Sequence, residues 1–471
     1  MTDSTSDSVS VKQKVSLGAN YWRLWTSSVI SNLGDGVTVI ALPWLASAVT
    51  RNAVLIALVA VASRLPWLVF TLPAGVITDR VDRRKLMWWA QSFRSVLMFG
   101  AAAIVLMYQS SLPSPGDVQS GVVSENMIVY SMIVLVALLA GFAEVLYDNS
   151  AQTILPAIVD PENLEKANSR LWGAEMVTNS FIGPPLGSVL IAVAFALPFI
   201  FDAGTFAVAA ALIFFLAGSF TTPGKSDAQS ERKIDWWGEI KEGVSWLWNH
   251  PLLRPMAIIL GLLNGLGSVT GATLVLFAQE SLDIDAFVFA ILATSGAVGG
   301  IIGSVVAPRA SKVLGSGISL YVTLITGIVA NFVIGFATHW SLVFVMFALF
   351  SFSGMLWNVI TVSLRQTIIP DELLGRVNSV YRLFAWGSMP LGFIVGGVLV
   401  SGLEAAGASR DTALRSPWWF AAGAYALLFV YAAPKLTTKR IEAARSEGIA
   451  AKEKTAERTE PGSQQDPKVA E

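Results

Sequence analysis

The sequence predicts an all-α integral membrane protein whose twelve transmembrane helices form two six-helix, pseudo-symmetric bundles. Three observations lead to this fold class. Of the 471 residues, 54% are hydrophobic and only 14% are charged, whereas soluble globular proteins carry about 25% charged residues. Twelve apolar runs are long enough to cross a bilayer, and short motifs of the first half recur in the second. Such a chain is too apolar for a series of soluble domains.

The apolar runs set the number of expected membrane crossings. A spanning helix needs about 20 mostly apolar residues. Runs of this kind are expected at 24–48, 54–77, 86–107, 127–150, 171–195, 199–219, 255–279, 286–307, 317–336, 341–364, 380–402 and 417–434. An even number of crossings places both ends of the chain on the same side of the membrane.

Lys and Arg residues in the short loops predict which side that is. Cytoplasmic loops of membrane proteins carry an excess of these cations. With a cytoplasmic N-terminus, the inner loops hold sixteen of them, and the outer loops hold only Arg51, Arg410 and Arg415. The sequence therefore predicts a multi-pass protein of the cell (inner) membrane with both termini in the cytoplasm.

The longest polar segment divides the crossings six and six. The expected parts are an N-terminal cytoplasmic tail (1–20), an N-terminal six-helix bundle (21–220), a cytoplasmic linker (221–253), a C-terminal six-helix bundle (254–434) and a C-terminal cytoplasmic tail (435–471). In the linker, Trp237, Ile240, Val244 and Leu247 recur every three or four positions, which is typical of an amphipathic helix in the lipid interface. We interpret this helix as a tether between the bundles, with a partner-binding helix as the alternative.

The two bundles carry matching motifs. The segments 151–190 and 365–399 both contain Gln-Thr-Ile, then Asn-Ser, and then two glycines four residues apart, which begin at Gly183 and Gly392. Repeated six-helix units are an architecture of transporters, in which the substrate site lies near the midplane between the repeats.

Several function classes are disfavoured by the composition. The chain has no cysteine and only two histidines, His250 and His339, which lie far apart, so cysteine chemistry and a His-rich metal site are not expected. It has no complete GxxxxGK[ST] phosphate loop, which argues against an ATP-driven pump. A net charge of −1 creates no global field that attracts nucleic acid. We expect no enzymatic activity, no cofactor, no metal and no nucleic-acid partner.

The densest charge cluster lies in the short loop between the second and third runs, "GVITDRVDRRKLM" (75–87). Its cations hold the loop in the cytoplasm, but that task does not require acids. Asp79 and Arg83 are four residues apart, which is the spacing of a helical ion pair. Because such a pair can form in one conformation and break in another, we favour a conformational latch of Gly75, Asp79, Arg80 and Arg83 over a topology signal alone.

From about residue 20 to residue 434 the chain resembles the major facilitator superfamily of transporters. "GVITDRVDRRK" is similar to the superfamily's signature loop between helices 2 and 3. "NLGDGVTVIALPW", "EGVSWLWNHPLLR" and "QTIIPDELLGRVNS" resemble the group that contains macrolide and siderophore exporters. The resemblance implies that Gly75 lets helices approach closely, and that Asp79 pairs with Arg83 and faces the start of helix 11.

Three positions depart from the pattern of the family. Asp82 stands where the signature loop usually has glycine. The helix 5 segment "IGPPLGS" ends in Ser188, where the antiporter motif has glycine, and helix 4 carries Glu144 in place of the arginine typical of many drug antiporters.

Helix 5 keeps an exporter-like motif formed by Gly183, Pro184 and Gly187. Small residues permit close helix contact, and proline kinks a helix. Helix packing without a role in export is the alternative interpretation.

Ionisable residues inside the apolar runs are candidates for proton or substrate binding, because charge inside a bilayer is costly. Asp35 lies twelve residues beyond Arg23, about 18 Å along a helix, and Arg64 reaches a similar depth on the returning helix. A structural Asp35–Arg64 ion pair is the alternative.

Three further acids lie in helices 4 and 5. Glu144 and Asp148 are one turn apart on helix 4, and Glu175 lies inside helix 5. Like charges at that spacing repel, so we expect one of them to be protonated or paired, with Arg170 or Arg94 as the partner. A gate network at the inner mouth is the alternative to a proton or substrate site.

These features predict a secondary active transporter that exports a moderately apolar small molecule (a drug, macrolide or siderophore-like metabolite) by proton antiport with alternating access. The expected partners are this small molecule, protons and the lipid bilayer, and the protein is expected to be a monomer. An uptake symporter is the first alternative, because a fold does not decide direction. A non-transporting membrane receptor or scaffold is the second. A membrane enzyme is disfavoured because no nucleophile–base or metal constellation occurs.

Overall fold

The structure is a computed structural model that describes residues 17–218, 220 and 236–459. Every regular element in these ranges is helical, which confirms the all-α prediction. The helices of the N-terminal half are α1 (Gly18–Val49), α2 (Ala53–Arg80), α3 (Arg83–Met107), η1 (Gln109–Ser111), α4 (Met127–Ile158), η2 (Pro161–Asn163), α5 (Leu164–Glu175), η3 (Met176–Ile182), α6 (Gly183–Val193) and α7 (Leu197–Phe214). The segment from α5 through η3 to α6 runs as one crossing.

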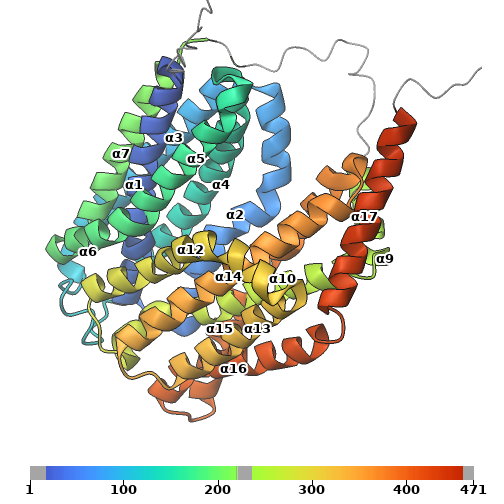
Figure 1. Ribbon diagram of the computed structural model, residues 1–471. Helices are drawn as coiled ribbons and strands as arrows, with labels where there is room; N and C mark the ends of the chain where they lie inside the picture. Colours follow the sequence, from blue (N-terminus) through green and yellow to red (C-terminus); the bar gives the residue numbers. More distant parts are fainter. Residues whose placement is uncertain (1–16, 219, 221–235, 460–471) are drawn as a thin grey trace, which may run out of the picture.

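The C-terminal half follows the same plan. Its helices are α9 (Trp236–Asn249), α10 (Leu253–Gly271), α11 (Leu274–Leu276), η4 (Phe277–Ser281), α12 (Ala286–Leu314), α13 (Ser316–Gly335), α14 (Trp340–Ile368), α15 (Asp371–Ala405), α16 (Arg410–Ala432) and α17 (Thr438–Thr459). Eleven helical segments of the described residues are long and apolar enough to cross a membrane. α16 is the twelfth crossing, because α15 ends on one side of the bundle and α17 lies on the other (Figure 1).

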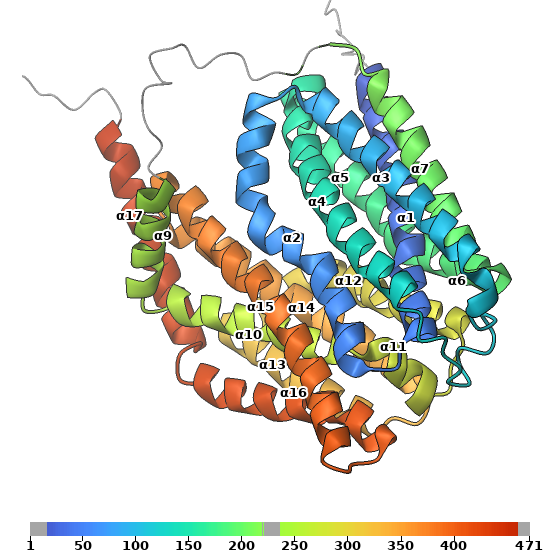
Figure 2. The same ribbon diagram turned by 180° about the vertical axis from the view of Figure 1, so that it is seen from behind.

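The helix ends define two faces of the molecule. We call the end at which α1 begins the Gly18 face, and the end at which α1 is followed by α2 the Arg51 face. In Figures 1 and 2, α1–α7 form one bundle and α10–α16 form a second. The bundles lie close together at the Arg51 face and diverge toward the Gly18 face, which also carries α9 and α17. The predicted pair of six-helix bundles is confirmed.

Side-chain caps fix where several helices begin at the Arg51 face. Asn52 accepts a hydrogen bond from Val54 N at 2.9 Å, and Asn126 accepts one from Ile128 N at 3.1 Å. These contacts satisfy backbone N–H groups that have no partner inside the first turn of α2 and α4. The short turns between the helices are therefore encoded locally.

The two bundles repeat one close helix contact. A Cβ added at Gly183 would collide with the backbone of Gly36 in α1, and one at Gly187 would also meet α1. In the other bundle, a Cβ at Gly392 or Gly396 would collide with backbone oxygens of α10. Only glycine permits these approaches, so the glycines of the matching motifs hold the corresponding helices of each bundle together.

Two crossings are interrupted within the membrane. α5 passes into the π-helical segment η3 before α6, where Pro184 and Pro185 lack the N–H groups that a continuous α-helix needs. α10 ends at Gly271 and continues as α11 and the π-helical η4. Local π-helix is frequent at functional sites, and broken helices line substrate sites in many transporters.

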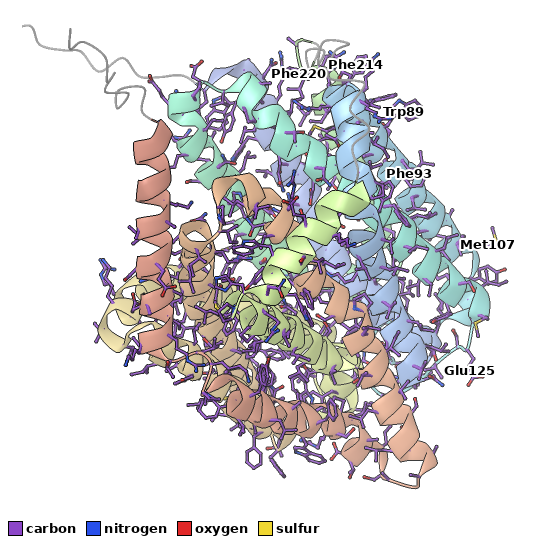
Figure 3. The ribbon with its side chains drawn as sticks, turned by 90° about the vertical axis from the view of Figure 1, so that its right-hand side faces the viewer. Trp89, Phe93, Met107, Glu125, Phe214 and Phe220 are labelled. Carbon is purple, nitrogen blue, oxygen red and sulfur yellow. The ribbon has the colours of Figure 1, made fainter. Side chains whose placement is uncertain are left out.

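Exposed apolar side chains mark the surface that faces lipid. Trp89 and Met107 of α3 are 63% and 73% exposed, and Phe214 of α7 is 61% exposed. Figure 3 shows Trp89, Phe93 and Met107 projecting outward along one edge of the N-terminal bundle, between Phe220 at one end and Glu125 at the other. An apolar band of this kind is favourable against lipid tails and unfavourable in water.

At the Gly18 face the helices extend past the apolar runs. α4 continues to Ile158, beyond the predicted end at 150, and α15 begins at Asp371, before the predicted start at 380. α15 has 35 residues, which correspond to about 52 Å at 1.5 Å per residue, whereas the hydrocarbon layer is about 30 Å thick. The polar helix ends therefore stand outside the membrane, and hydrophobicity alone does not reveal them.

Candidate functional site: a charged cavity between the bundles

A cavity of about 890 Å³ lies between the two bundles. Among the described residues, all the charged side chains that line it belong to the N-terminal bundle: Asp35, Arg64, Arg94, Glu144, Asp148 and Glu175. The C-terminal bundle contributes apolar residues only: Gly271, Ala272, Leu274, Val275, Phe289, Ala293, Trp386 and Phe393. One wall of the cavity is therefore charged and the opposite wall is apolar.

The partner of Asp35 is Arg94 of α3. Nη2 of Arg94 donates to Oδ1 of Asp35. The Arg94 side chain is 3% exposed and that of Asp35 is 24% exposed, so the carboxylate faces the cavity and the guanidinium lies behind it. The guanidinium also packs over the ring of Phe206, 4.0 Å from its centroid. The predicted alternative of an Asp35–Arg64 ion pair is wrong.

A second polar contact sets the register that brings Arg94 to Asp35. One turn before Arg94, Nε2 of Gln91 donates to Oγ of Ser31 at 2.9 Å. Ser31 lies one turn before Asp35 on α1, and both Gln91 and Ser31 are buried. Because residues three to four apart share a helix face, the two pairs form a polar ladder between α3 and α1.

Asp202 of α7 is a second anionic neighbour of Arg94. It is fully buried and does not line the cavity. Its carboxylate accepts hydrogen bonds from Oγ1 of Thr38 at 2.7 Å and from Oγ1 of Thr205 at 3.2 Å. The buried guanidinium therefore pairs with a carboxylate at the cavity and interacts electrostatically with a second carboxylate inside the bundle.

The other acids gather around this pair. Glu144 and Asp148 lie on α4 and both interact electrostatically with Asp35 and Arg94. Glu175, at the end of α5, interacts with Glu144 and Asp148. All three line the cavity. The structure thus brings Asp35, Glu144, Asp148 and Glu175 into one cluster with more carboxylates than cations.

Two of the cations considered above form no ion pair with these acids. Arg64 is exposed in the cavity wall and forms no ion pair with another described residue. Arg170 stacks over the ring of Trp22 at 5.6 Å from its centroid, so it is not the close partner of the helix 4 acids. Arg64 is therefore a solvated positive charge beside the acidic cluster.

Charged side chains join the two bundles at the Arg51 face. Glu280 of η4 accepts a hydrogen bond from Nε of Arg410 at 2.7 Å and lies 3.5 Å from Nη1 of Arg51. Arg410 also donates to Glu404 at 2.6 Å and to the backbone oxygen of Arg51 at 2.9 Å. Arg51 donates to Gln279. These contacts tie the turn between α1 and α2 to η4 and α16 and close this end of the cavity.

The opposite end of the cavity is open. Trp172 lines the cavity from α5 and is 65% exposed, whereas Ala46 and Ile56, at the end near the Arg51 face, are 0% and 4% exposed. The bundles are also far apart at the Gly18 face in both ribbon views (Figures 1 and 2). The conformation is therefore closed at the Arg51 face and open at the Gly18 face.

The loop between α2 and α3 is anchored to its own bundle. Asp82 caps α3 by accepting from Lys85 N at 3.2 Å, and it also accepts from Phe220 N at 3.3 Å. Nη1 of Arg83 donates to the backbone oxygen of Thr153 at 3.1 Å, and Nη1 of Arg84 donates to the backbone oxygen of Leu216, just after α7, at 2.8 Å. The departure of Asp82 from glycine is thus explained by helix capping.

The structure tests the predictions for the other latch residues, Gly75, Asp79 and Arg80, only in part. The side chain of Asp79 lies outside what the structure describes, so its pairing with Arg83 stays a prediction. Arg80 is exposed. A Cβ at Gly75 would meet no atom within 4 Å, so the close approach predicted there is wrong for this conformation. The reason is that the bundles diverge at the Gly18 face, which separates α2 from the start of α15.

Sequence reasoning missed two features of the site. Arg94 was considered only as a partner of the helix 4 acids, although an arginine deep within an apolar run is itself a signal. Glu280 and Arg410 lie at helix ends, where the sequence gives no reason to distinguish them from ordinary charges at the membrane–water interface. Only the fold brings them to Arg51. Among the described residues, no group of three or more His, Asp or Glu side chains is placed to hold a metal ion.

Comparison with known proteins shows that the chain is similar to export proteins. The chain is 26% identical over 394 residues to the multidrug efflux pump Tap of Mycolicibacterium fortuitum, a match that covers 80% of this chain and 89% of that protein. It is 24% identical over 334 residues to the enterobactin exporter EntS of Citrobacter koseri, which covers 70% and 72% of the two chains.

A solved structure shares the fold. The crystal structure of a bacterial homologue of the iron transporter ferroportin in an inward-facing state matches with a TM-score of 0.64 at 18% identity, over 89% of this chain and 100% of that one. The family model of the Major Facilitator Superfamily matches residues 24–389. With twelve crossings, two repeated bundles and a cavity between them, this chain belongs to the Major Facilitator Superfamily of transporters.

Proposed function

We propose that this transporter exports a moderately apolar small molecule from the cytoplasm in exchange for protons. It acts as a monomer in the cell (inner) membrane, with both termini in the cytoplasm and no nucleic-acid partner. The observation that carries the proposal is the cavity between the bundles, which has a carboxylate cluster on one wall and an apolar surface on the other. This wall chemistry suits a molecule with an apolar body, and the acids offer sites for protons.

The arrangement around Arg94 supports the proposed proton coupling. When Asp35 is ionised it compensates the buried guanidinium, and when it takes up a proton the ion pair weakens. Asp202 then remains as a buried counter-ion for Arg94. Glu144 has no such direct cationic partner among the described residues, so a proton on Glu144 removes repulsion from Asp148 and Asp35. We therefore assign Glu144 the main proton site and Asp35 a supporting one, with Asp148, Glu175 and Arg64 tuning the charge of the cavity.

Export requires that the cavity face each side in turn. In the proposed orientation, the open Gly18 face is cytoplasmic, and the ion pairs around Glu280 close the outer side. The latch residues Gly75, Asp79, Arg80 and Arg83 hold the opposite state, in which the cytoplasmic ends of the bundles meet. The efflux function of the two named relatives supports the direction, as does the excess of cations at the Gly18 face.

Transport in proteoliposomes tests the function. The purified protein is reconstituted with a pH-sensitive dye inside, and ethidium, tetracycline and erythromycin are offered under an imposed proton gradient. The expected result is counter-movement of protons and at least one compound, abolished by a protonophore and absent from liposomes without protein. Movement of protons and compound in the same direction would indicate an uptake symporter. No flux with any compound would favour a receptor or scaffold.

The orientation has its own test, because the chain contains no cysteine. Single cysteines replace Asp117, in the segment between α3 and α4, or Ala228, in the linker. In intact cells, an impermeant thiol reagent should modify the cysteine at 117 and spare the one at 228. The reverse pattern would show that the Gly18 face is external.

A further inference from the structure

A smaller cavity of about 220 Å³ lies inside the C-terminal bundle, among α10, α13, α14 and α16. We call it the side pocket. It shares Gly271 and Leu274 with the central cavity. Gly271 is exposed, whereas Ala330 and Ile334 at the far wall are 2% and 1% exposed. The side pocket is therefore a blind recess whose mouth opens on the central cavity where α10 breaks.

The wall of the side pocket is aromatic and rigid. Phe347, Phe350 and Trp418 contribute their rings. The Trp418 ring is itself packed, with its centroid 5.4 Å from that of Phe277 and 5.8 Å from that of Phe347. Rings at these separations favour offset or edge-on contact, so they offer a pre-formed surface to a further apolar group.

The hydroxyl of Thr270 and the amide nitrogen of Asn331, two polar groups of the wall, already donate within their own helices. Oγ1 of Thr270 donates to the backbone oxygen of Gly267 at 3.0 Å, and Nδ2 of Asn331 donates to the backbone oxygen of Gly327 at 2.7 Å. An ordered water needs two to four polar partners, and apolar cavities of about 150 Å³ stay dry and bind molecules such as benzene. The side pocket exceeds that size, so its favoured occupant is an apolar group.

Two glycines keep the side pocket open although helix packing does not require glycine at either position. A Cβ at Gly267 would meet no atom within 4 Å, and one at Gly271 would make only an ordinary contact with Phe393 at 3.5 Å. This differs from Gly392, where a Cβ would collide with backbone. The missing side chains of Gly267 and Gly271 leave room at the wall and at the mouth of the side pocket.

We propose that the side pocket is a subsite of the transport cavity that binds an aromatic ring of the cargo, which enters past Gly271. The proposal rests on the proposed function in that cargo occupies the central cavity. The ring inserts among Phe347, Phe350 and Trp418, while the polar part of the cargo stays near the acids of the opposite wall. The side pocket thus selects cargo by the presence of a ring, independently of its charge.

Thiol labelling tests the proposal on purified protein in detergent, without any gradient. Ala330→Cys places the only cysteine of the chain at the far wall, and modification by N-ethylmaleimide is followed by mass spectrometry. Gly267→Leu, added to this variant, fills the side pocket. Gly423→Leu is the matched control, since Gly423, like Gly267, is a helical glycine with free space at its Cβ, but it lines neither cavity. Ile334→Cys is a second reporter if Ala330→Cys does not fold.

The expected result is labelling that slows about tenfold or more with Gly267→Leu and is unchanged with Gly423→Leu. Tetraphenylphosphonium, which carries phenyl rings, should protect the cysteine, and tetramethylammonium, which has the same charge and no ring, should not. A labelling rate that Gly267→Leu does not change, or equal protection by the two cations, overturns the proposal. Because this experiment measures no transport, its result can be interpreted even if proton-driven export fails in proteoliposomes.

Discussion

Arg94 and Asp35 form an ion pair in which the guanidinium is buried inside the N-terminal bundle and the carboxylate stands at the edge of the central cavity. The pair links a side chain that cannot reach water to one that can. A change at the cavity, such as arrival of a proton or of cargo, therefore alters the electrostatics of the bundle interior. Asp202, on α7, limits that change by keeping a second negative charge near Arg94.

The first prediction concerns this charge balance. Arg94→Gln removes the cation from between two acids and should destabilise the protein strongly, since breaking a buried ion pair by removing one partner costs about 3–5 kcal/mol. Asp35→Asn should cost much less, because Arg94 keeps Asp202. Thermal unfolding of both variants in detergent measures the difference. A loss of stability in Asp35→Asn equal to that in Arg94→Gln would show that Asp202 does not serve as a counter-ion.

The second prediction concerns proton coupling. Glu144→Gln should abolish proton-driven export and retain cargo binding, because the amide keeps the size of the side chain and cannot release a proton. Asp35→Asn should be impaired less cleanly. Transport at several pH values in proteoliposomes, together with direct binding of the exported compound, distinguishes the two steps. Full proton-driven transport by Glu144→Gln would move the coupling role to Asp35, Glu175 or another group.

The third prediction concerns the latch. Asp79→Asn should insert and express normally, because the cations that set topology remain, while transport slows or stops as the state closed at the Gly18 face loses its ion pair. Asp82→Asn is the matched control: it changes the neighbouring acid of the loop and retains a side chain able to cap α3. Transport rates of the two variants in the same vesicles give the comparison. Equal rates in Asp79→Asn and the unmodified protein would leave the loop as a topology signal only.

The fourth prediction concerns the Arg51 face. Glu280→Gln removes a carboxylate that both Arg51 and Arg410 approach, so the closed state should weaken. A cysteine at Ala46, which lines the cavity and is fully buried, should react faster with an impermeant thiol reagent applied to that face. Glu404→Gln, which loses a contact to Arg410 alone, should raise the rate less. Unchanged reactivity in Glu280→Gln would mean that apolar packing closes this end.

Much of the architecture could be predicted from the sequence, because the physics of a bilayer acts on runs of residues. Twelve apolar runs and the matching glycine motifs were enough to predict two six-helix bundles. The ends of α4 and α15 were beyond such reasoning, since those turns are polar and stand outside the hydrocarbon layer. A helix that leaves the membrane follows local propensity and capping, which hydrophobicity does not report.

The sequence was sufficient to predict which acids belong to the site, but not which cation pairs with Asp35. Each acid inside an apolar run is costly and therefore conspicuous in the sequence, and all four of those singled out line the cavity. Depth along a helix suggested Arg64 for Asp35, but pairing depends on which faces of α1, α2 and α3 meet. That choice is made by contacts such as Gln91–Ser31, which join residues distant in the sequence and leave no local pattern.

The last prediction concerns His250, which lies between α9 and α10. Its Nδ1 accepts hydrogen bonds from Leu252 N at 3.2 Å and Leu253 N at 3.1 Å, and so caps the start of α10. Burial lowers the pKa of His250 below its ordinary value of 6.5, and the carboxylate of Glu447 opposes this shift only in part. The folded protein therefore favours the neutral ring, whose Nδ1 is free to accept.

Because the folded-state pKa is lower than the unfolded-state pKa, the contribution of His250 to stability is fully present above about pH 6.5. It is lost as the pH falls from there through the folded-state pKa. His250→Asn keeps a capping oxygen that does not titrate, so it should remove this part of the acid sensitivity, which is about 1 kcal/mol for a helix cap. Thermal unfolding in detergent between pH 7.5 and pH 5 is the measurement, because the two proteins should diverge only on acidification. Parallel curves over that whole range would show that protonation of His250 does not disturb the cap.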